Sequence, residues 1–248
     1  MSGHSKWKTI KHAKAATDAK RGKVFSLIGK EITIAVKAGG GNAEFNPQLR
    51  TLLAKAKAAN MPNENIQRAI KKGTGEIAGE QIEELIYEGY AYGVGFIVEV
   101  TTDNKNRTVS DVRSAFEKCG GNLANSGALA FTFQRKGQFF FTKDQIEEEK
   151  LTELALEADA EDILTEEDGY EVLCAVADFD KVAKVFEDAK VTPESAELVY
   201  LPMTTVTIED AEVGKKLNKL TERLEDLEDV KTVYSNYELS PALHLEEE

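Results

Sequence analysis

The sequence contains few of the residues that build disulfides, metal sites or catalytic centres. Among 248 residues there are two cysteines, three histidines and one tryptophan. Cys119 and Cys174 are far apart, form no C-x-x-C motif and have apolar neighbours, which predicts two buried, reduced thiols. No segment approaches about 18 uninterrupted apolar residues, so a membrane-spanning helix is not expected. The N-terminus lacks the apolar core of a secretory signal, so we expect a cytoplasmic protein, with a basic transit peptide as the alternative.

Common motifs of catalysis and ligand binding are also missing. The glycines at 39–41 are not followed by the Lys-Ser/Thr pair of a phosphate-binding loop, and Ser126 has no G-x-S-x-G frame. The acidic run 159–168 lacks the ligand order of a calcium loop and is interpreted as a solvated face. The histidines lie near the chain ends, and no His/Cys spacing fits a metal site. We therefore predict no enzyme activity, no metal, no cofactor and no small-molecule substrate.

Acidic residues are scarce in the first 75 positions. Residues 1–75 hold fifteen Lys/Arg against four Asp/Glu, a net charge of +11. Residues 76–248 hold sixteen Lys/Arg against forty Asp/Glu, a net charge of −24, so the overall charge of −13 conceals a division. An acidic protein repels nucleic acid, but a separate basic module can still bind it.

The basic part has the pattern of a small helical domain. Apolar residues near 3.6-residue spacing predict a helix over 8–38, with a break near 21–23 as an alternative. Asn46 and Pro47 predict the N-cap and first turn of a second helix that runs to about residue 59. A third, short helix is expected to end at Lys71-Lys72-Gly73, and 73–75 to be the linker to the rest of the chain.

After residue 80 the hydrophobic period becomes strand-like. A β-hairpin is expected over 83–102, then a helix capped by Thr108, then two strands on either side of a turn at Lys136-Gly137. The remaining expected elements are a helix at 144–158, strands at 161–165 and 170–176, a helix at 178–189, a strand at 196–208, a helix at 210–227 and a strand at 230–237.

This order of elements predicts an α+β protein with an N-terminal three-helix-type domain and two small α/β sandwich domains, one inserted in the other. The last helix needs a sheet to cover, and the first α/β group lacks a second helix, so these two belong together. We expect a basic helical nucleic-acid-binding domain at 1–77, a discontinuous α/β domain at 78–133 and 205–240, and an inserted acidic α/β domain at 134–204. Each α/β domain is expected to carry its helices on one face, as in a split β-α-β sandwich.

The N-terminal arm has the composition of a nucleic-acid contact. Seven Lys/Arg fall between residues 6 and 23, opposed only by Asp18, and a helix would align Lys8, Lys11 and Lys14 along one side. Such a row can follow a phosphate backbone, although lysine reads bases less well than arginine. The predicted nucleic-acid-binding residues are Lys6, Trp7, Lys8, Lys11, His12, Lys14, Lys20, Arg21, Lys23, Arg50, Lys55, Lys57, Arg68, Lys71 and Lys72.

Other interpretations of these residues remain open. The arm is alternatively a solvated face, or a segment that docks on the acidic part of its own chain. Trp7 either stacks on a base or packs over its own helices. The loop 103–107 is a candidate second contact, or a plain turn.

Several long motifs resemble the YebC/PmpR family, and together they span essentially the whole chain. They are GHSKWKTIKHAKAATDAKRGKVF (3–25), NPQLR (46–50), KAKAANMP (55–62), IQRAIKKGTG (66–75), YEGY (87–90), TDNKNRT (102–108) and GGNL (120–123). Two positions depart from the family pattern. Ala91-Tyr92-Gly93 replaces a Gly-Pro-Gly-type hairpin turn, and Gly29 stands where a stronger helix former is expected.

The resemblance implies three domains, one inserted in another, in a cytoplasmic protein without enzymatic activity. Bacterial relatives are described as DNA-binding transcriptional regulators. The mitochondrial relative is a translational activator of cytochrome c oxidase subunit I, and other bacterial relatives are linked to ribosomes stalled on proline-rich sequences. The expected partner is therefore nucleic acid, either DNA or ribosomal or messenger RNA, with the ribosome included and no membrane.

We predict a non-enzymatic nucleic-acid-binding regulator of gene expression. The leading interpretation of the chain is a DNA-binding transcriptional regulator. The alternative is a ribosome-associated translation factor or translational activator that binds RNA. The absence of a clear helix-turn-helix with a base-reading helix mildly favours the alternative. A third class, an adaptor that binds proteins through its acidic domains, also remains open.

Overall fold

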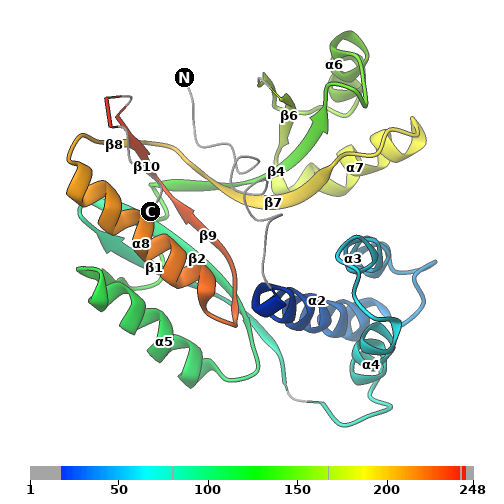
Figure 1. Ribbon diagram of the computed structural model, residues 1–248. Coiled ribbons are helices and arrows are strands. Elements are labelled where there is room, and N and C mark those ends of the chain that lie inside the picture. Colours follow the sequence, from blue (N-terminus) through cyan, green and yellow to red (C-terminus); the bar gives the residue numbers. More distant parts are fainter. Residues whose placement is uncertain (1–17, 80, 167, 241, 244–248) are drawn as a thin grey trace. The chain divides into compact units, whose positions relative to one another are not determined.

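The structure is a computed structural model that describes residues 18–79, 81–166, 168–240 and 242–243 (Figure 1). The chain forms two compact units, one made of residues 1–129 and 205–248 and the other of residues 130–204. Helices come first, and sheets with helices follow. The predicted α+β class, a helical N-terminal part followed by α/β parts, is confirmed.

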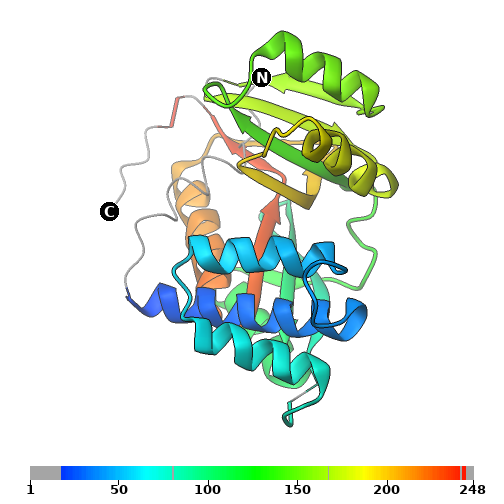
Figure 2. The ribbon, with the colours of Figure 1, turned by 90° about the vertical axis from the view of Figure 1, so that its right-hand side faces the viewer.

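The helical part consists of α2 (Asp18–Gly39), α3 (Pro47–Ala58) and α4 (Asn63–Thr74). Both α3 and α4 pack on α2 (Figure 2). Their common core includes Ile28, Ile32, Leu49 and Ile66. From Asp18 onward α2 is continuous, so the alternative of a break near 21–23 is wrong. Packing outweighs the low helix propensity of the glycines in this segment.

Gly73 lies inside α4 and not in a linker, which corrects the predicted end of this helix. A Cβ at this position would lie 2.6 Å from the Cβ of Val36 and 2.9 Å from the carbonyl oxygen of Thr33. Glycine therefore allows α4 to approach the backbone of α2. The helix ends at Gly75, which has φ +81° and forms the left-handed C-cap.

Asn46 is the predicted N-cap of α3, and it is almost fully buried. Its Oδ1 accepts a hydrogen bond from the N–H of Leu49 at 3.0 Å. Its Nδ2 donates to the carbonyl oxygens of Ala35 and Gly40, both at 2.9 Å. One side chain thus starts α3 and also satisfies carbonyls at the end of α2.

The first sheet has the order β3-β1-β2-β9, with all neighbours antiparallel. A core that includes Phe96, Phe116 and Leu220 joins one face of this sheet to α5 and α8, which lie on that side in Figure 1. A parallel pair, β8 and β10, adds to this core. The bounds are β1 (Glu83–Ala91), β2 (Val94–Thr102), α5 (Lys105–Lys118), β3 (Gly121–Leu123), β8 (Val206–Ile208), α8 (Ala211–Asp226), β9 (Val230–Ser235) and β10 (Tyr237–Leu239).

The N-cap of α5 is Asn104, whose Oδ1 accepts from the N–H of Arg107 at 3.1 Å. The prediction that Thr108 caps this helix is therefore wrong by one turn. The segment 103–107 is mostly the first turn of α5 and not a separate loop.

The second unit contains a sheet in the order β5-β6-β4-β7, again antiparallel throughout. Strands β4 and β5 flank β6, which is the split β-α-β arrangement. The core joins Phe139, Phe141, Leu151 and Phe186 from the sheet and its two α-helices. The bounds are β4 (Phe133–Thr142), α6 (Glu148–Glu157), β5 (Asp162–Thr165), β6 (Gly169–Cys174), α7 (Phe179–Asp188) and β7 (Ser195–Pro202), with a 3-10 turn at Val176–Asp178.

Two strand predictions in this region are wrong. The expected turn at Lys136-Gly137 is instead the middle of β4. A Cβ at Gly137 would lie 2.5 Å from the sulfur of Cys174, so this glycine serves close packing. The expected strand over 196–208 is two strands, because β7 ends at Pro202 and β8 begins at Val206.

Cys119 and Cys174 are both buried and form no disulfide. Among the residues described, no helix is long and apolar enough to cross a bilayer. The same residues contain no group of three or more His, Cys, Asp or Glu side chains placed to hold a metal ion.

Candidate nucleic-acid interface

The helical part presents basic side chains on the outer faces of α3 and α4. Arg50 and Lys57 are exposed on α3 at i, i+7 spacing, which places them on one side of that helix. Arg68 and Lys71 are exposed on α4 at i, i+3 spacing. The opposite sides of the two helices are apolar and face α2. The amphipathic pattern that builds the core therefore also positions these four cations outward.

Other predicted residues contact the protein itself. Lys23 donates a hydrogen bond to the carbonyl oxygen of Glu225 at the end of α8. Lys55 forms an ion pair with Glu31 at 3.4 Å. Arg68 is 3.9 Å from Glu64, but both side chains are well exposed, so this pair contributes little. Lys72 is half-buried, and its aliphatic stem lies next to Gly79.

Part of the predicted interface lies outside the described residues. This part comprises Lys6, Trp7, Lys8, Lys11, His12 and Lys14. Lys20 belongs to α2, but its side chain is also outside what the structure describes. Arg21 follows it and is exposed. The arm as a nucleic-acid contact thus stays a prediction.

Two ion pairs from adjacent residues attach α2 to the first sheet. Lys30 lies 2.6 Å from Asp229, and Glu31 lies 2.7 Å from Lys231. Lys231 stands at a β-bulge, where Val100 pairs with Val230 and the next pair joins Glu99 to Thr232. The bulge breaks the ordinary alternation of side chains and brings Lys231 towards α2. Glu31 is 6% exposed, so this carboxylate serves the interior of the fold.

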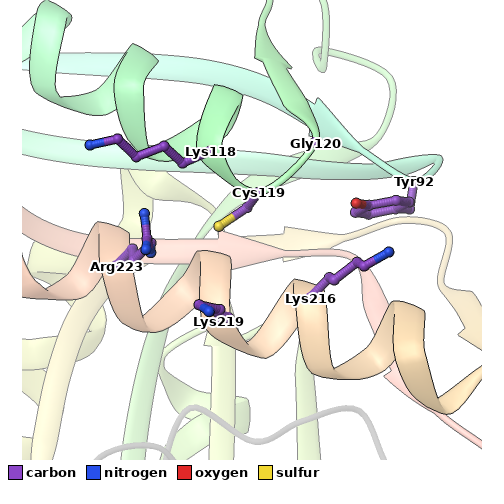
Figure 3. Close-up of a pocket in the computed structure, with 7 residues that line it drawn as sticks. All are labelled: Tyr92, Lys118, Cys119, Gly120, Lys216, Lys219 and Arg223. Atoms are coloured by element: carbon purple, nitrogen blue, oxygen red, sulfur yellow. The ribbon is translucent and has the colours of Figure 1, made fainter.

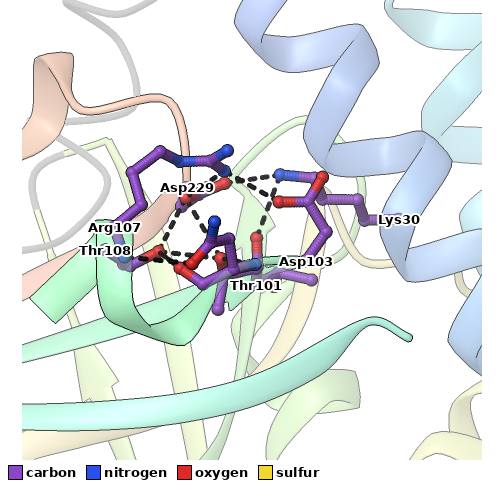
Figure 4. Close-up of polar contacts among 8 residues, drawn as sticks. Lys30, Thr101, Asp103, Arg107, Thr108 and Asp229 are labelled. Atoms are coloured by element: carbon purple, nitrogen blue, oxygen red, sulfur yellow. Dashed lines mark hydrogen bonds and ion pairs between the residues drawn. The ribbon is translucent and has the colours of Figure 1, made fainter. Parts of the chain in front are cut away.

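Asp229 is the centre of a polar network that joins α2, α5 and the first sheet (Figure 4). It is 4% exposed. One oxygen accepts from Lys30, and the other accepts from Arg107 at 2.9 Å and from the hydroxyl of Thr108 at 2.7 Å. Thr102 also donates to this second oxygen at 3.1 Å.

The network fixes the charge states of its members. Burial raises the pKa of Asp229, but hydrogen bonds from Lys30, Arg107 and Thr108 outweigh it and lower the pKa to about 2. Hydrogen bonds to Asp229 and Asp103 raise the pKa of Arg107 above its ordinary value. Arg107 thus has two internal partners although its side chain is 45% exposed, and a second contact at 103–107 stays a prediction.

Sequence reasoning missed Phe45, whose side chain is 80% exposed. An apolar residue before an N-cap commonly packs against the fourth helical residue, but here that residue is Arg50. An apolar residue at position 45 without an apolar partner at position 50 was the sequence signal for this exposed side chain. Lys37, exposed in the last turn of α2, was also missed.

Comparison with known proteins covers almost the whole chain. Residues 5–76 match the profile of the TACO1/YebC protein N-terminal domain, and residues 82–237 match that of the TACO1/YebC second and third domain. A protein from Opitutus terrae is 49% identical over 98% of both chains, and one from Geobacter sulfurreducens is 52% identical over 97% of both. Each is named a probable transcriptional regulatory protein. The crystal structure of a conserved hypothetical protein from Aquifex aeolicus is 45% identical, covers 94% of this chain and 96% of that one, and superposes with a TM-score of 0.81.

Proposed function

The chain belongs to the TACO1/YebC family, and from this membership we propose that it is a non-enzymatic, cytoplasmic regulator of gene expression that binds nucleic acid. Relatives at about half identity are named probable transcriptional regulatory proteins, so DNA-binding control of transcription is the leading function. The observation that carries the nucleic-acid proposal is the exposed basic surface of α3 and α4, formed by Arg50, Lys57, Arg68 and Lys71.

The scarcity of opposing acids strengthens this surface. Residues 1–75 contain four acidic residues, and Glu31 is buried in two internal ion pairs. The charge that faces solvent is therefore strongly positive, and phosphate groups are the ligand that it attracts. Cations spread over two helices suit contacts to a backbone more than the reading of bases by a single helix.

The test is to reverse two of these charges in the full chain. We expect Arg50→Glu/Lys57→Glu to weaken binding to duplex DNA and to lower the slope of log affinity against log salt by about 1.8, because two phosphate contacts are lost. The control is Lys143→Glu/Lys150→Glu, which makes the same charge change at exposed positions of the other unit. Equal binding by the two double variants would refute the assignment of the surface to α3 and α4.

A translation factor that binds ribosomal or messenger RNA is the second candidate. The observation that favours it is that the exposed cations are spread over two helices and are not gathered on one base-reading helix, an arrangement that suits the backbone of folded RNA. Sedimentation of the native protein with ribosomes, set against pull-down of specific promoter fragments, separates the two. Absence from ribosomal fractions at moderate salt, together with selective retention of one promoter, would eliminate the translational function.

A further inference from the structure

A basic groove lies between α5 and α8, on the face of the first sheet that these helices cover (Figure 3). Its main hollow has a volume of about 290 Å³ and is lined by Tyr92, Lys118, Cys119, Gly120, Lys216, Lys219 and Arg223. A second hollow of about 180 Å³ shares Lys118 and Arg223 with the first. The two hollows therefore adjoin along the helix pair, and together they are called the groove.

The sequence of α8 aligns the cations of this groove. Lys216, Lys219 and Arg223 follow i, i+3, i+7 spacing and form a stripe along one side of the helix. Each directly precedes a leucine of the buried stripe, formed by Leu217, Leu220 and Leu224. Packing of those leucines against the sheet therefore holds the three cations beside α5. Lys118 comes from the last turn of α5 and lines the same hollow.

Tyr92 closes one end of the groove. It lies in the turn between β1 and β2, and its ring centroid is 5.6 Å from the Nζ of Lys216. A Cβ on Gly120 would lie 2.4 Å from the Tyr92 hydroxyl, so only glycine leaves room for this ring. Tyr92 as a whole is 39% exposed, and its ring lies next to the cations.

The four cations have no acidic partner within ion-pair distance among the described residues. Of the residues that line the two hollows, Asp111 is the acidic one, and it belongs to the second hollow. Like charges at i, i+3 and i, i+4 destabilise a helix by a few tenths of a kcal/mol per pair. Four of the sixteen basic residues beyond position 75 thus converge on one hollow in a segment that also holds forty acids.

We propose that this groove binds phosphate groups of a single-stranded nucleic-acid segment, as a second contact beyond the helical part. The proposal rests on the nucleic-acid function proposed above. Cations beside an exposed aromatic ring are the combination that binds single strands, because the cations hold the backbone and the ring stacks on a base. A free phosphate or nucleotide carries the same phosphate chemistry, and the experiment distinguishes it from a strand.

The experiment compares two double variants of the full chain by anisotropy of a labelled single-stranded RNA. Lys118→Glu/Lys219→Glu removes one groove cation from each helix. Arg113→Glu/Lys215→Glu makes the same charge change on the same two helices, at exposed positions that do not line the groove. We expect the groove variant to bind about tenfold more weakly than the control, and its salt slope to fall by about 1.4. Tyr92→Leu should weaken binding without changing the salt slope.

Three outcomes would overturn the groove site, and they differ in what they say of the proposed function. If the wild type binds RNA and the two double variants bind it equally, the groove fails and the proposed function stands. If the wild type binds neither RNA nor DNA, both fail. If inorganic phosphate or a mononucleotide at the same concentration as the RNA displaces the RNA from the wild type, the ligand is a small molecule and not a strand. Unfolding midpoints of all variants verify that the fold is retained.

Discussion

Replacement of Asp229 by asparagine tests how α2 is held on the first sheet. Asparagine keeps the shape of the side chain but removes the charge that Lys30 and Arg107 share. The lowering of the Asp229 pKa from 3.8 to about 2 corresponds to about 2 kcal/mol of stability in the charged form. Lys30 has a side chain only 12% exposed, so it would be left as a nearly buried cation without its carboxylate. We therefore expect Asp229→Asn to destabilise the first unit by at least about 2 kcal/mol.

The pH dependence gives this prediction a second, independent measure. Because the folded-state pKa lies below the unfolded value, the stabilisation is complete above about pH 5 and is lost as pH falls towards 2. The difference in stability between wild type and Asp229→Asn should shrink by about 1 kcal/mol between about pH 6 and about pH 3, because the carboxyl of the unfolded wild type becomes protonated in this range while that of the folded protein stays mostly charged. A difference that stays constant or widens on acidification would contradict the charged network.

Urea unfolding followed by circular dichroism gives the free energies, and hydrogen exchange of peptides from α2 locates the loss. The control is Glu228→Gln, at the exposed residue immediately before Asp229. It should unfold within about 0.5 kcal/mol of wild type. If Asp229→Asn lowers the free energy of unfolding by less than about 0.5 kcal/mol, the network contributes no net stability.

Further predictions concern individual residues. Gly22→Ala should stabilise the protein by about 0.5–1 kcal/mol in thermal unfolding, because open space surrounds this helical glycine, whereas Gly73→Ala should destabilise it by more than 1 kcal/mol through the clash with Val36. Burial, followed by the nearby charges of Asp178 and Glu161, raises the pKa of Cys174 to about 11. In a Cys119→Ser background, the native protein should therefore not react with a thiol reagent at pH 8 until it unfolds. Phe45→Ala should leave the unfolding midpoint unchanged, because this side chain is 80% exposed, and should weaken binding of single-stranded nucleic acid. Unchanged binding would show that the ring does not stack on bases.

Features with a local signal could be predicted from the sequence. The start of α3 followed from an N-cap asparagine and a proline at the first helical position. The hairpin of β1 and β2 followed from strand-like periodicity on both sides of a short turn. In both cases a few adjacent residues determine the backbone, so one sequence is sufficient.

Features that depend on distant contacts could not be predicted in this way. Gly137 looks like a turn residue until Cys174 and Phe179 are placed against it, and then it is a residue selected for close packing. The partners of Asp229 come from positions 30, 102, 107 and 108, and no spacing in the sequence links them. The groove was missed because the leucine stripe of α8 predicts a buried face, while the adjacent basic stripe is concealed by the acidic total of its segment.

The two basic surfaces of this chain belong to the same compact unit, and the attachment of α2 determines their separation. Lys30 pairs with Asp229, and Glu31 pairs with Lys231. The charges therefore run positive then negative along α2, and negative then positive along the segment that α2 contacts. A shift of α2 by one residue would place Glu31 against Asp229, so the two pairs fix the register of the helix as well as its contact. Contacts to phosphate carry no sequence information, but two such surfaces at a fixed separation accept only ligands whose shape reaches both. Selectivity of the proposed regulator would then come from the geometry of its ligand, with the buried ion pairs as the element that keeps this geometry constant.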